Sequence, residues 1–228
     1  MLKLLLGRAG TGKTRALLEA MAAGDGRPQI LIVPEQHSHS MERQLCAIGG
    51  SRVSLFAEVL SFTRLANRVF SVYGGLAAPA LDGGGRLLLL CAALRSVAPE
   101  LRVYQRPSRK PAFLSGLLAT VDELKTCRIT PEQLWTAGEE SGGGEGDKLR
   151  DLSLIYGAYE AMTARQGADP RDRLTRLAEA LTREDWAAGK DFYLDAFTDF
   201  TPQERAVLST LLGKANSVTV ALTCDKLE

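Results

Sequence analysis

The sequence predicts an α/β fold in which a parallel sheet is interrupted by an inserted all-helical subdomain. Two observations favour this class. The first third of the chain alternates short apolar strands with amphipathic helices, and strands return only near its carboxyl end. Between these parts, residues 79–185 show helical periodicity alone. We therefore expect a sheet domain built from 1–78 and 186–228 and a helical subdomain over 79–185.

Apolar runs bounded by turn residues predict the strands of the sheet domain. Strands are expected over 2–6, 29–33, 52–56, 192–195 and 217–223. The segment from Phe62 to Tyr73 has its apolar residues at helical spacing, which predicts an amphipathic helix. Its predicted buried face consists of Leu65, Ala66, Val69 and Phe70. A strand followed by a helix, repeated, predicts parallel strands.

Several helices of the predicted helical subdomain have readable starts. Thr130-Pro131-Glu132-Gln133 is a capping box with proline at the first helical position, and Asp169-Pro170 opens another helix. Between them lies an apolar stripe that we expect in the core, made of Leu149, Leu152, Tyr156, Tyr159 and Met162. The glycine-rich segment 141–146 is predicted to be a mobile surface loop between two helices.

Composition limits the classes of function. The chain has 228 residues and a net charge of +1, so it offers no overall electrostatic attraction to nucleic acid. The four cysteines form no Cys-x-x-Cys pair and have only His37 and His39 for company, which argues against a zinc site or a disulfide framework. No run of 18 apolar residues occurs, and no signal peptide is recognisable. We expect a cytoplasmic protein with reduced thiols and no membrane partner.

The strongest chemical signal is a Walker A (P-loop) motif between the first strand and the first helix. It consists of Gly7, Arg8, Ala9, Gly10, Thr11, Gly12, Lys13 and Thr14. Glycines let backbone N–H groups curl around a phosphate, and the helix that follows adds its positive N-terminal dipole. In this motif the lysine reaches the β- and γ-phosphate oxygens, and the hydroxyl after it holds Mg²⁺. The motif predicts ATP·Mg²⁺ bound at Lys13 and Thr14.

Asp195 is the predicted second ligand of the magnesium ion. It ends an apolar strand that we expect to lie beside the strand preceding the P-loop. P-loop NTPases place a Mg²⁺-holding aspartate at such a strand end. The metal site is therefore predicted from Thr14 and Asp195.

Two segments carry a resemblance to a known family. The run Asp195-Ala196-Phe197-Thr198-Asp199-Phe200, continued by 201–204, resembles the Asp-Glu-Phe-Gln-Asp segment of UvrD-like superfamily 1 helicases. Ser61-Phe62-Thr63-Arg64-Leu65-Ala66 resembles their Thr-Phe-His-x-Leu-Ala segment. Together with Val33-Pro34-Glu35-Gln36, they are still more similar to the AddB (RexB) family, which supplies the second subunit of the bacterial AddAB helicase-nuclease.

The resemblance implies that the chain is the N-terminal part of a longer protein. It would be the first RecA-like P-loop motor domain with its inserted helical subdomain, and a second motor domain and an iron–sulfur nuclease domain would lie beyond Glu228. It also implies a heterodimer with an AddA-type helicase-nuclease subunit. The substrates implied are single-stranded DNA and double-stranded DNA ends, processed for recombinational repair.

One departure from the helicase pattern bears on activity. Ala196 stands where active helicases carry the glutamate that activates the attacking water, and its methyl group accepts no proton. We therefore expect nucleotide binding with weak or no hydrolysis. The glutamine that reads adenine upstream of the P-loop in helicases also has no counterpart, which leaves adenine specificity open.

The resemblance also supplies candidates for DNA contact, because the matching segments of superfamily 1 proteins face single-stranded DNA. The candidates are Pro34, Gln36, Phe62, Thr63, Arg64 and Arg68. Arg64 and Arg68 would meet phosphate, whereas Phe62 would either stack on a base or pack in the core. The basic stretch Tyr104–Pro111 has a composition suited to backbone contact, although a plain solvated loop fits it as well.

Other functions stay open at this point. Asp122-Glu123-Leu124-Lys125 contains a Glu-x-Lys arrangement found in nucleases, but helical periodicity predicts a solvated helix face and no nuclease activity. A P-loop small-molecule kinase would use the helical insertion as a lid. An architectural module that holds a partner and keeps a vestigial P-loop is the other alternative.

Overall fold

The computed structural model describes residues 1–24, 26–77, 79–105 and 111–224. The chain divides into two compact units. Met1–Leu76 and Leu174–Glu228 form one, here called the sheet unit, and Ala77–Arg173 forms the other, the helical unit. Each is described by itself.

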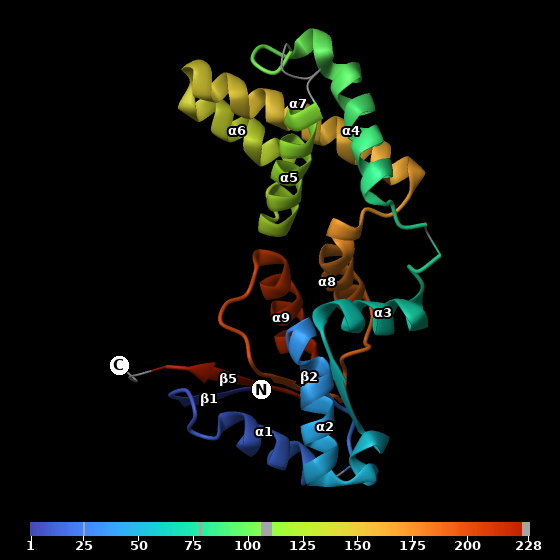
Figure 1. Ribbon diagram of the computed structural model, residues 1–228, viewed down its shortest axis with the longest axis vertical. Coiled ribbons are helices and arrows are strands. Elements are labelled where there is room, and N and C mark those ends of the chain that lie inside the picture. Colours follow the sequence, from blue (N-terminus) through green and yellow to red (C-terminus); the bar gives the residue numbers. More distant parts are fainter. Residues whose placement is uncertain (25, 78, 106–110, 225–228) are drawn as a thin grey trace. The chain divides into compact units, whose positions relative to one another are not determined.

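The sheet unit contains one five-stranded sheet in which every pairing is parallel. Its strands are β1 (Leu2–Gly7), β2 (Gln29–Ile32), β3 (Ala57–Leu60), β4 (Asp191–Leu194) and β5 (Ser217–Thr223). Their order across the sheet is β1-β5-β4-β2-β3, and Figure 1 shows β1 beside β5. The α/β class with a parallel sheet is therefore confirmed.

The strand order corrects one expectation about the site. Asp195 follows β4, and β4 does not lie beside β1, because β5 pairs with both strands and separates them. Apolar residues on both faces of β5 are buried, including Val218 and Ala221, which suits a central position. Sequence periodicity identifies such a strand but does not say between which neighbours it lies.

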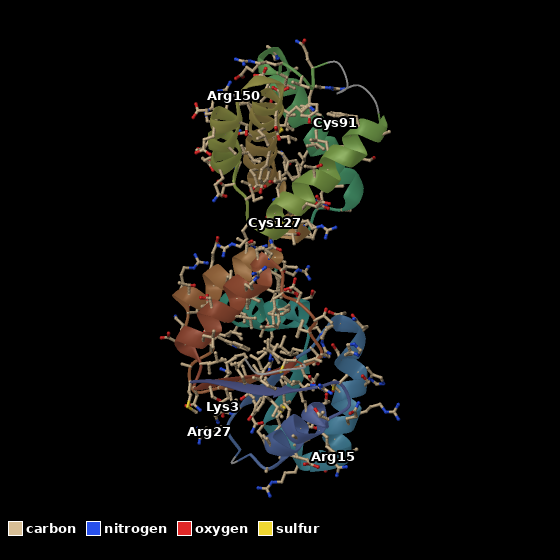
Figure 2. All side chains as sticks on the ribbon, turned by 90° about the vertical axis from the view of Figure 1, so that its left-hand side faces the viewer. Lys3, Arg15, Arg27, Cys91, Cys127 and Arg150 are labelled. Atoms are coloured by element: carbon tan, nitrogen blue, oxygen red, sulfur yellow. The ribbon has the colours of Figure 1, made fainter. Side chains whose placement is uncertain are left out.

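Helices cover both faces of the sheet (Figure 2). One face packs on α1 (Lys13–Ala22) and α2 (Ser38–Gly49). The other packs on α3 (Phe62–Tyr73), α8 (Arg173–Arg183) and α9 (Pro202–Lys214). The predicted face of α3 is buried as expected. Helix α8, which the sequence boundaries assigned to the helical subdomain, packs here through Leu177 and Leu181.

The strand predicted over 52–56 is wrong. Ser51–Leu55 forms a 3₁₀ helix, η2, and the strand begins only at Ala57. Gly50, at φ 65°, turns the chain directly before η2, and Val53 is the buried residue of that turn. Leu55, an inward residue in the predicted strand, is 84% exposed. Alternation over five residues did not distinguish a short strand from one turn of helix.

The helical unit is built around a separate apolar core. Its elements are α4 (Gly83–Val97), η3 (Ala98–Glu100), α5 (Pro111–Cys127), α6 (Pro131–Ser141), α7 (Gly143–Gln166) and η5 (Pro170–Asp172). The stripe predicted on α7 lies in this core, and the capping box predicted at Thr130 is formed. The helix expected to open at Asp169-Pro170 begins as η5 and becomes α8 at Arg173. Among the described helices, none combines the length and apolar content needed to cross a membrane.

The mobile loop predicted over 141–146 is also wrong, because α7 already begins at Gly143. Gly146 is buried, and a Cβ atom added to it would lie 2.4 Å from the carbonyl oxygen of Gly138 on α6. A glycine is needed wherever two helix backbones approach this closely. The glycines here therefore serve helix packing rather than flexibility.

The expected solvated face at Asp122–Lys125 is only partly correct. The segment is helical, but Lys125 is buried and forms ion pairs with Asp172 (2.7 Å), Asp169 (3.3 Å) and Glu160. Arg86, also buried, pairs with Asp122 and Asp169. Opposite charges that converge from α4, α5, α7 and η5 explain why a lysine is tolerated inside the unit.

Candidate functional site

The predicted site residues of the sheet unit follow the carboxyl ends of its strands. The glycine-rich loop follows β1, Pro34 and Gln36 follow β2, Phe62 and Thr63 follow β3, and Asp195 follows β4. Because all these strands are parallel, their carboxyl ends lie along one edge of the sheet. Open α/β sheets bind ligands at this edge.

The glycine-rich loop makes a tight turn between β1 and α1. Gly10 and Gly12 have φ values of 76° and 85°, a left-handed conformation that favours glycine. The Lys13 ammonium group donates hydrogen bonds to the carbonyl oxygens of Gly7 (2.8 Å) and Arg8 (2.7 Å). The Thr11 hydroxyl also donates to Arg8 O, at 2.9 Å. The lysine head group thus lies against the loop that the motif assigns to phosphate binding.

The amino terminus of α1 is electrostatically suited to an anion. Gly12 is its N-cap, no acidic residue occupies its first turn, and Thr14 is only partly buried. Exposed N–H groups at a helix start carry a partial positive charge, which no carboxylate of this turn neutralises. Arg15 points away from the loop and pairs with Glu19 instead (Figure 2).

Asp195 is buried at the end of β4 and is only partly satisfied. Its side chain belongs to a residue that is 5% exposed, and its Oδ1 accepts a hydrogen bond from the Ala196 N–H at 2.8 Å. Its Oδ2 is buried without a hydrogen-bond partner. A buried carboxylate oxygen without a partner costs free energy, so it marks a place where a cation or donor would be favourable.

Ala196, the residue after Asp195, has an unusual backbone conformation. Its φ is 65°, one of two positive values among the described non-glycine residues. This conformation costs an L-amino acid about 1–2 kcal/mol. The strain falls on the residue that replaces the catalytic glutamate of the helicase pattern.

The register of the sheet gives the separation between the loop and Asp195. Gly7 is level with Thr223, whereas Leu194 is level with Val220, so Asp195 lies two residues short of Gly7. This corresponds to about 7 Å along the strands and, across two strand spacings, about 10 Å sideways. The two groups face the same edge, with room for a ligand between them.

A pocket of about 500 Å³ at this edge brings several candidates together. Its lining includes Pro34, Gln36, Phe62, Thr63 and Ala196. Four of the six DNA-contact candidates therefore share one cavity with the alanine after Asp195. Sequence reasoning missed three further lining residues, Phe197, Thr198 and Asp199, although they belong to the segment that carried the family resemblance.

The chemistry of the pocket is aromatic and acidic rather than basic. The Phe62 ring is 5% exposed and packs edge-on against Phe197, with 5.6 Å between ring centroids. Glu35, Asp199 and Glu204 also line the pocket. Three carboxylates repel phosphate, so a nucleic acid strand here would be held through bases and sugars.

The two arginines predicted to contact DNA lie elsewhere. Arg64 lines a separate pocket of about 250 Å³ on the sheet unit, and Arg68 pairs with Glu58 at 2.8 Å. Both arginines are exposed. The structure therefore does not group them with the other four candidates. In the basic stretch Tyr104–Pro111, residues 106–110 lie outside the described residues.

The groups present fit a magnesium ion that is also held by phosphate. Among the described residues there is no cluster of three His, Cys, Asp or Glu side chains able to hold a metal. Mg²⁺ needs no such cluster, because it is usually bound by one or two carboxylates together with substrate phosphates and water. Asp195 offers a free carboxylate oxygen, and Thr14 offers a hydroxyl group.

Comparison with known proteins places this geometry in a family. Residues 4–228 match the family described as "ADDB, N-terminal". A protein of Desulforudis audaxviator is 41% identical over 98% of this chain, and one of Thermoanaerobacter sp. strain X514 is 38% identical over 98%. One of Acetivibrio thermocellus is 33% identical over the whole chain.

Each of these relatives is named as the second, or B, subunit of an ATP-dependent helicase/deoxyribonuclease. The chain spans 20% of their length. The sequence resemblance is thereby confirmed at the level of the family. With a family match over all but its first three residues, the chain belongs to the AddB N-terminal family.

Proposed function

We propose that this chain is the nucleotide-binding, helicase-like region of an AddB-type helicase-nuclease subunit, with a RecA-like P-loop core and an inserted helical subdomain. It binds ATP·Mg²⁺ with little hydrolysis and contacts single-stranded DNA. The longer protein pairs with an AddA-type subunit and processes DNA double-strand ends for recombinational repair. The names of the relatives support this proposal for the whole protein.

One observation carries the nucleotide proposal. A glycine-rich helix start without its own acidic residues and a buried carboxylate without a partner for Oδ2 lie along the same sheet edge. The first group suits a polyphosphate, and the second suits a cation bound to it. Lys13, Thr14 and Asp195 are the residues that would hold ATP·Mg²⁺, and the bound metal would neutralise phosphate charge.

The proposal of weak hydrolysis rests on Ala196. A general base must lie within hydrogen-bond reach of the attacking water, and a methyl group accepts no proton. The acidic pocket wall contains Glu35 and Asp199, but Asp199 already accepts a hydrogen bond from the Phe200 N–H at 2.7 Å. Nucleotide binding then stabilises a conformation of the protein instead of driving translocation.

Equilibrium binding of a fluorescent ATP analogue tests the nucleotide site. Lys13→Ala should weaken binding by at least about tenfold, because it removes a charge-assisted bond to phosphate. Arg15→Ala, one turn away on the solvent side of α1, is the matched control and should bind normally. Asp195→Asn should weaken binding in the presence of Mg²⁺ and leave the metal-free affinity unchanged. Equal affinities for wild type and Lys13→Ala would refute the proposal.

Steady-state ATPase activity tests the role of Ala196. Wild type should hydrolyse ATP far more slowly than an active helicase, and Ala196→Glu should raise the rate while leaving the affinity for ATP similar. Ala196→Gln is the control, since it adds the bulk of glutamate without its basicity. A wild-type rate near that of an active helicase would contradict the proposal.

DNA contact is tested by the anisotropy of a labelled oligothymidylate. Gln36→Ala and Thr63→Ala should weaken binding several-fold, whereas Arg68→Ala should change it little because Arg68 lies outside the pocket. The affinity should depend only weakly on salt, since the pocket wall is acidic. Loss of binding in Arg68→Ala with normal binding in Gln36→Ala would overturn this assignment.

One observation favours a second candidate, an architectural module with a vestigial loop. The Lys13 ammonium group already donates to two carbonyl oxygens of its own loop. Under this alternative those bonds stabilise the fold and no nucleotide binds. Thermal unfolding separates the two: ATP·Mg²⁺ should raise the Tm of wild type but not of Lys13→Ala, whereas a vestigial loop responds in neither protein.

A further inference from the structure

The edge strand β1 exposes an apolar face. Among the described strands β1 pairs only with β5, and its residues Leu2 and Leu4 are 50% and 53% exposed. Proteins usually protect a free sheet edge with charges, proline or a bulge. β1 carries a single charged residue, Lys3, labelled in Figure 2.

The register shows which face of the sheet this is. Leu2 and Leu4 are level with Val218 and Val220 of β5, and paired residues of neighbouring strands point to the same face. Val218 is buried in the core beneath α3, α8 and α9. The exposed leucines therefore continue a covered apolar face beyond the point where its cover ends.

Helix α9 presents an apolar residue toward the same border. Its Gln203 and Thr210 bond to Thr175 and Thr182 of α8, which identifies the flank that faces α8. Leu212 lies about 180° around the helix from that flank. It is 42% exposed. Since α9 packs over β5 and α8 lies on one side of it, Leu212 lies on the side toward β1.

The outer edge of β1 also offers backbone hydrogen bonds. Met1 O and Gly7 O accept from Val218 N and Cys224 N of the neighbouring segment. Groups along a parallel strand alternate in direction, so odd residues of β1 face β5 and even residues face outward. The N–H groups of Leu4 and Leu6 therefore point away from the sheet edge.

The handedness of the chain predicts how a strand could be added there. From β1 to β2 and from β2 to β3 the chain moves one way across the sheet, with α1 and α2 on one face. From β3 to β4 to β5 it moves the other way, with α3, α8 and α9 on the opposite face. Parallel crossovers are almost always right-handed. A connection from β5 to a strand outside β1 must therefore cross on the α9 face, over Leu2 and Leu4.

We propose that the edge of β1, with Leu2, Leu4 and Leu212, is the docking surface for a segment of the longer protein carboxyl-terminal to residue 228. That segment supplies a strand parallel to β1 and an apolar crossover element that covers the two leucines. The relatives provide the length required, because this chain covers only 20% of each. The proposal does not depend on nucleotide binding.

Residue-resolved hydrogen–deuterium exchange of the full-length protein, without its partner subunit, tests the proposal. The Leu4 and Leu6 amides should exchange at least about 100-fold more slowly than amides in exposed loops. The Lys3 and Leu5 amides, which face β5, are the internal control and should be protected in any case. Unprotected Leu4 and Leu6 amides would overturn the proposal.

Two further outcomes would also overturn it. Protection that appears only when the partner subunit is added would assign the surface to that subunit. Protection that increases with protein concentration would assign it to a second copy of the chain. As an independent measurement, Leu4→Lys should lower the Tm of the full-length protein, whereas Leu55→Lys, at an 84% exposed position of the same unit, should not. Equal Tm values for the two variants would contradict a covered Leu4.

Discussion

The two units treat buried aspartates in opposite ways. In the helical unit, Asp169 is 3% exposed and accepts hydrogen bonds from the Tyr159 hydroxyl (2.9 Å) and the Arg171 N–H (2.9 Å), besides its ion pairs with Arg86 and Lys125. In the sheet unit, Asp195 is 5% exposed, and its Oδ2 has no partner. Burial is similar, but only one of the carboxylates is internally satisfied.

This difference separates structural from functional charge. Burial alone would raise the pKa of Asp169, but the Arg171 N–H, Lys125 and Tyr159 hold it below its usual value. Such a carboxylate is occupied by the fold itself. A carboxylate with an unused buried oxygen at the ligand-binding edge of a parallel sheet remains available for a ligand. The predictions below test this contrast, and the chain's tryptophans help, because Trp135 reports on the helical unit and Trp186 on the sheet unit.

The largest effect is expected for Lys125→Met. It would leave Asp169, Asp172 and Glu160 without their shared cation, which should cost about 3–5 kcal/mol of the free energy of unfolding. Urea denaturation followed by Trp135 fluorescence measures it, in a Trp186→Phe background. Lys148→Met, at an exposed position of α7, is the control and should stay within about 0.5 kcal/mol of wild type. A small effect of Lys125→Met would mean that the network is not structural.

Alkaline pH should weaken the helical unit next. Burial, and then the charge of Glu160, raise the pKa of Tyr156 to about 12. Since the unfolded value is about 10, the folded state holds this proton more tightly, and its contribution is lost as pH rises from about 10 to 12. We expect a loss of about 2 kcal/mol over this range, and Tyr156→Phe should remove that loss. Parallel pH curves for the two proteins would show that Tyr156 is not responsible.

The two units should respond alike to loss of a helix cap. Thr130 on α6 and Thr201 on α9 both form complete capping boxes, one in each unit. Thr130→Ala and Thr201→Ala should each cost about 1 kcal/mol. Thr136→Ala is the matched control, because its hydroxyl bonds to a carbonyl oxygen inside α6 and should matter little. Fluorescence-detected denaturation should assign the two losses to different tryptophans.

The smallest effect on stability is expected for Asp195→Asn. It removes a charge that the protein leaves partly unpaired, so without ligands the free energy of unfolding should change by less than about 1 kcal/mol. Asp169→Asn, the equivalent change in the helical unit, should cost at least about 2 kcal/mol because it breaks a buried ion-pair network. Calorimetry of the two variants measures this contrast directly. Equal losses would remove the distinction drawn between the two aspartates.

Strong local patterns were sufficient for most of the fold. The apolar runs at 29–33, 192–195 and 217–223 are strands, and the amphipathic pattern over 62–73 is a helix, because burial of one face or of both faces imposes these periods. The failures occurred where local patterns were short or ambiguous. Residues 52–56 form a helical turn, and the glycines near 146 serve close helix contact instead of a loop.

The candidate site divides in the same way. The glycine-rich loop is recognisable because its chemistry is contiguous in the chain. The pocket that joins Gln36, Thr63 and Ala196 required three strand ends to meet, and the separation of Arg64 and Arg68 from that pocket followed from their positions on α3. Lys125 was misjudged because its partners come from other elements.

By itself, the sequence determined the family, the parallel α/β class and the residues of the phosphate-type loop, since each depends on neighbours along the chain. Only the tertiary structure decided that β5 lies between β1 and β4, that Asp195 keeps one oxygen unpaired and that Lys125 is internal. Strand order and charge pairing join residues far apart in sequence, and their free energies depend on burial and distance, which local patterns do not contain.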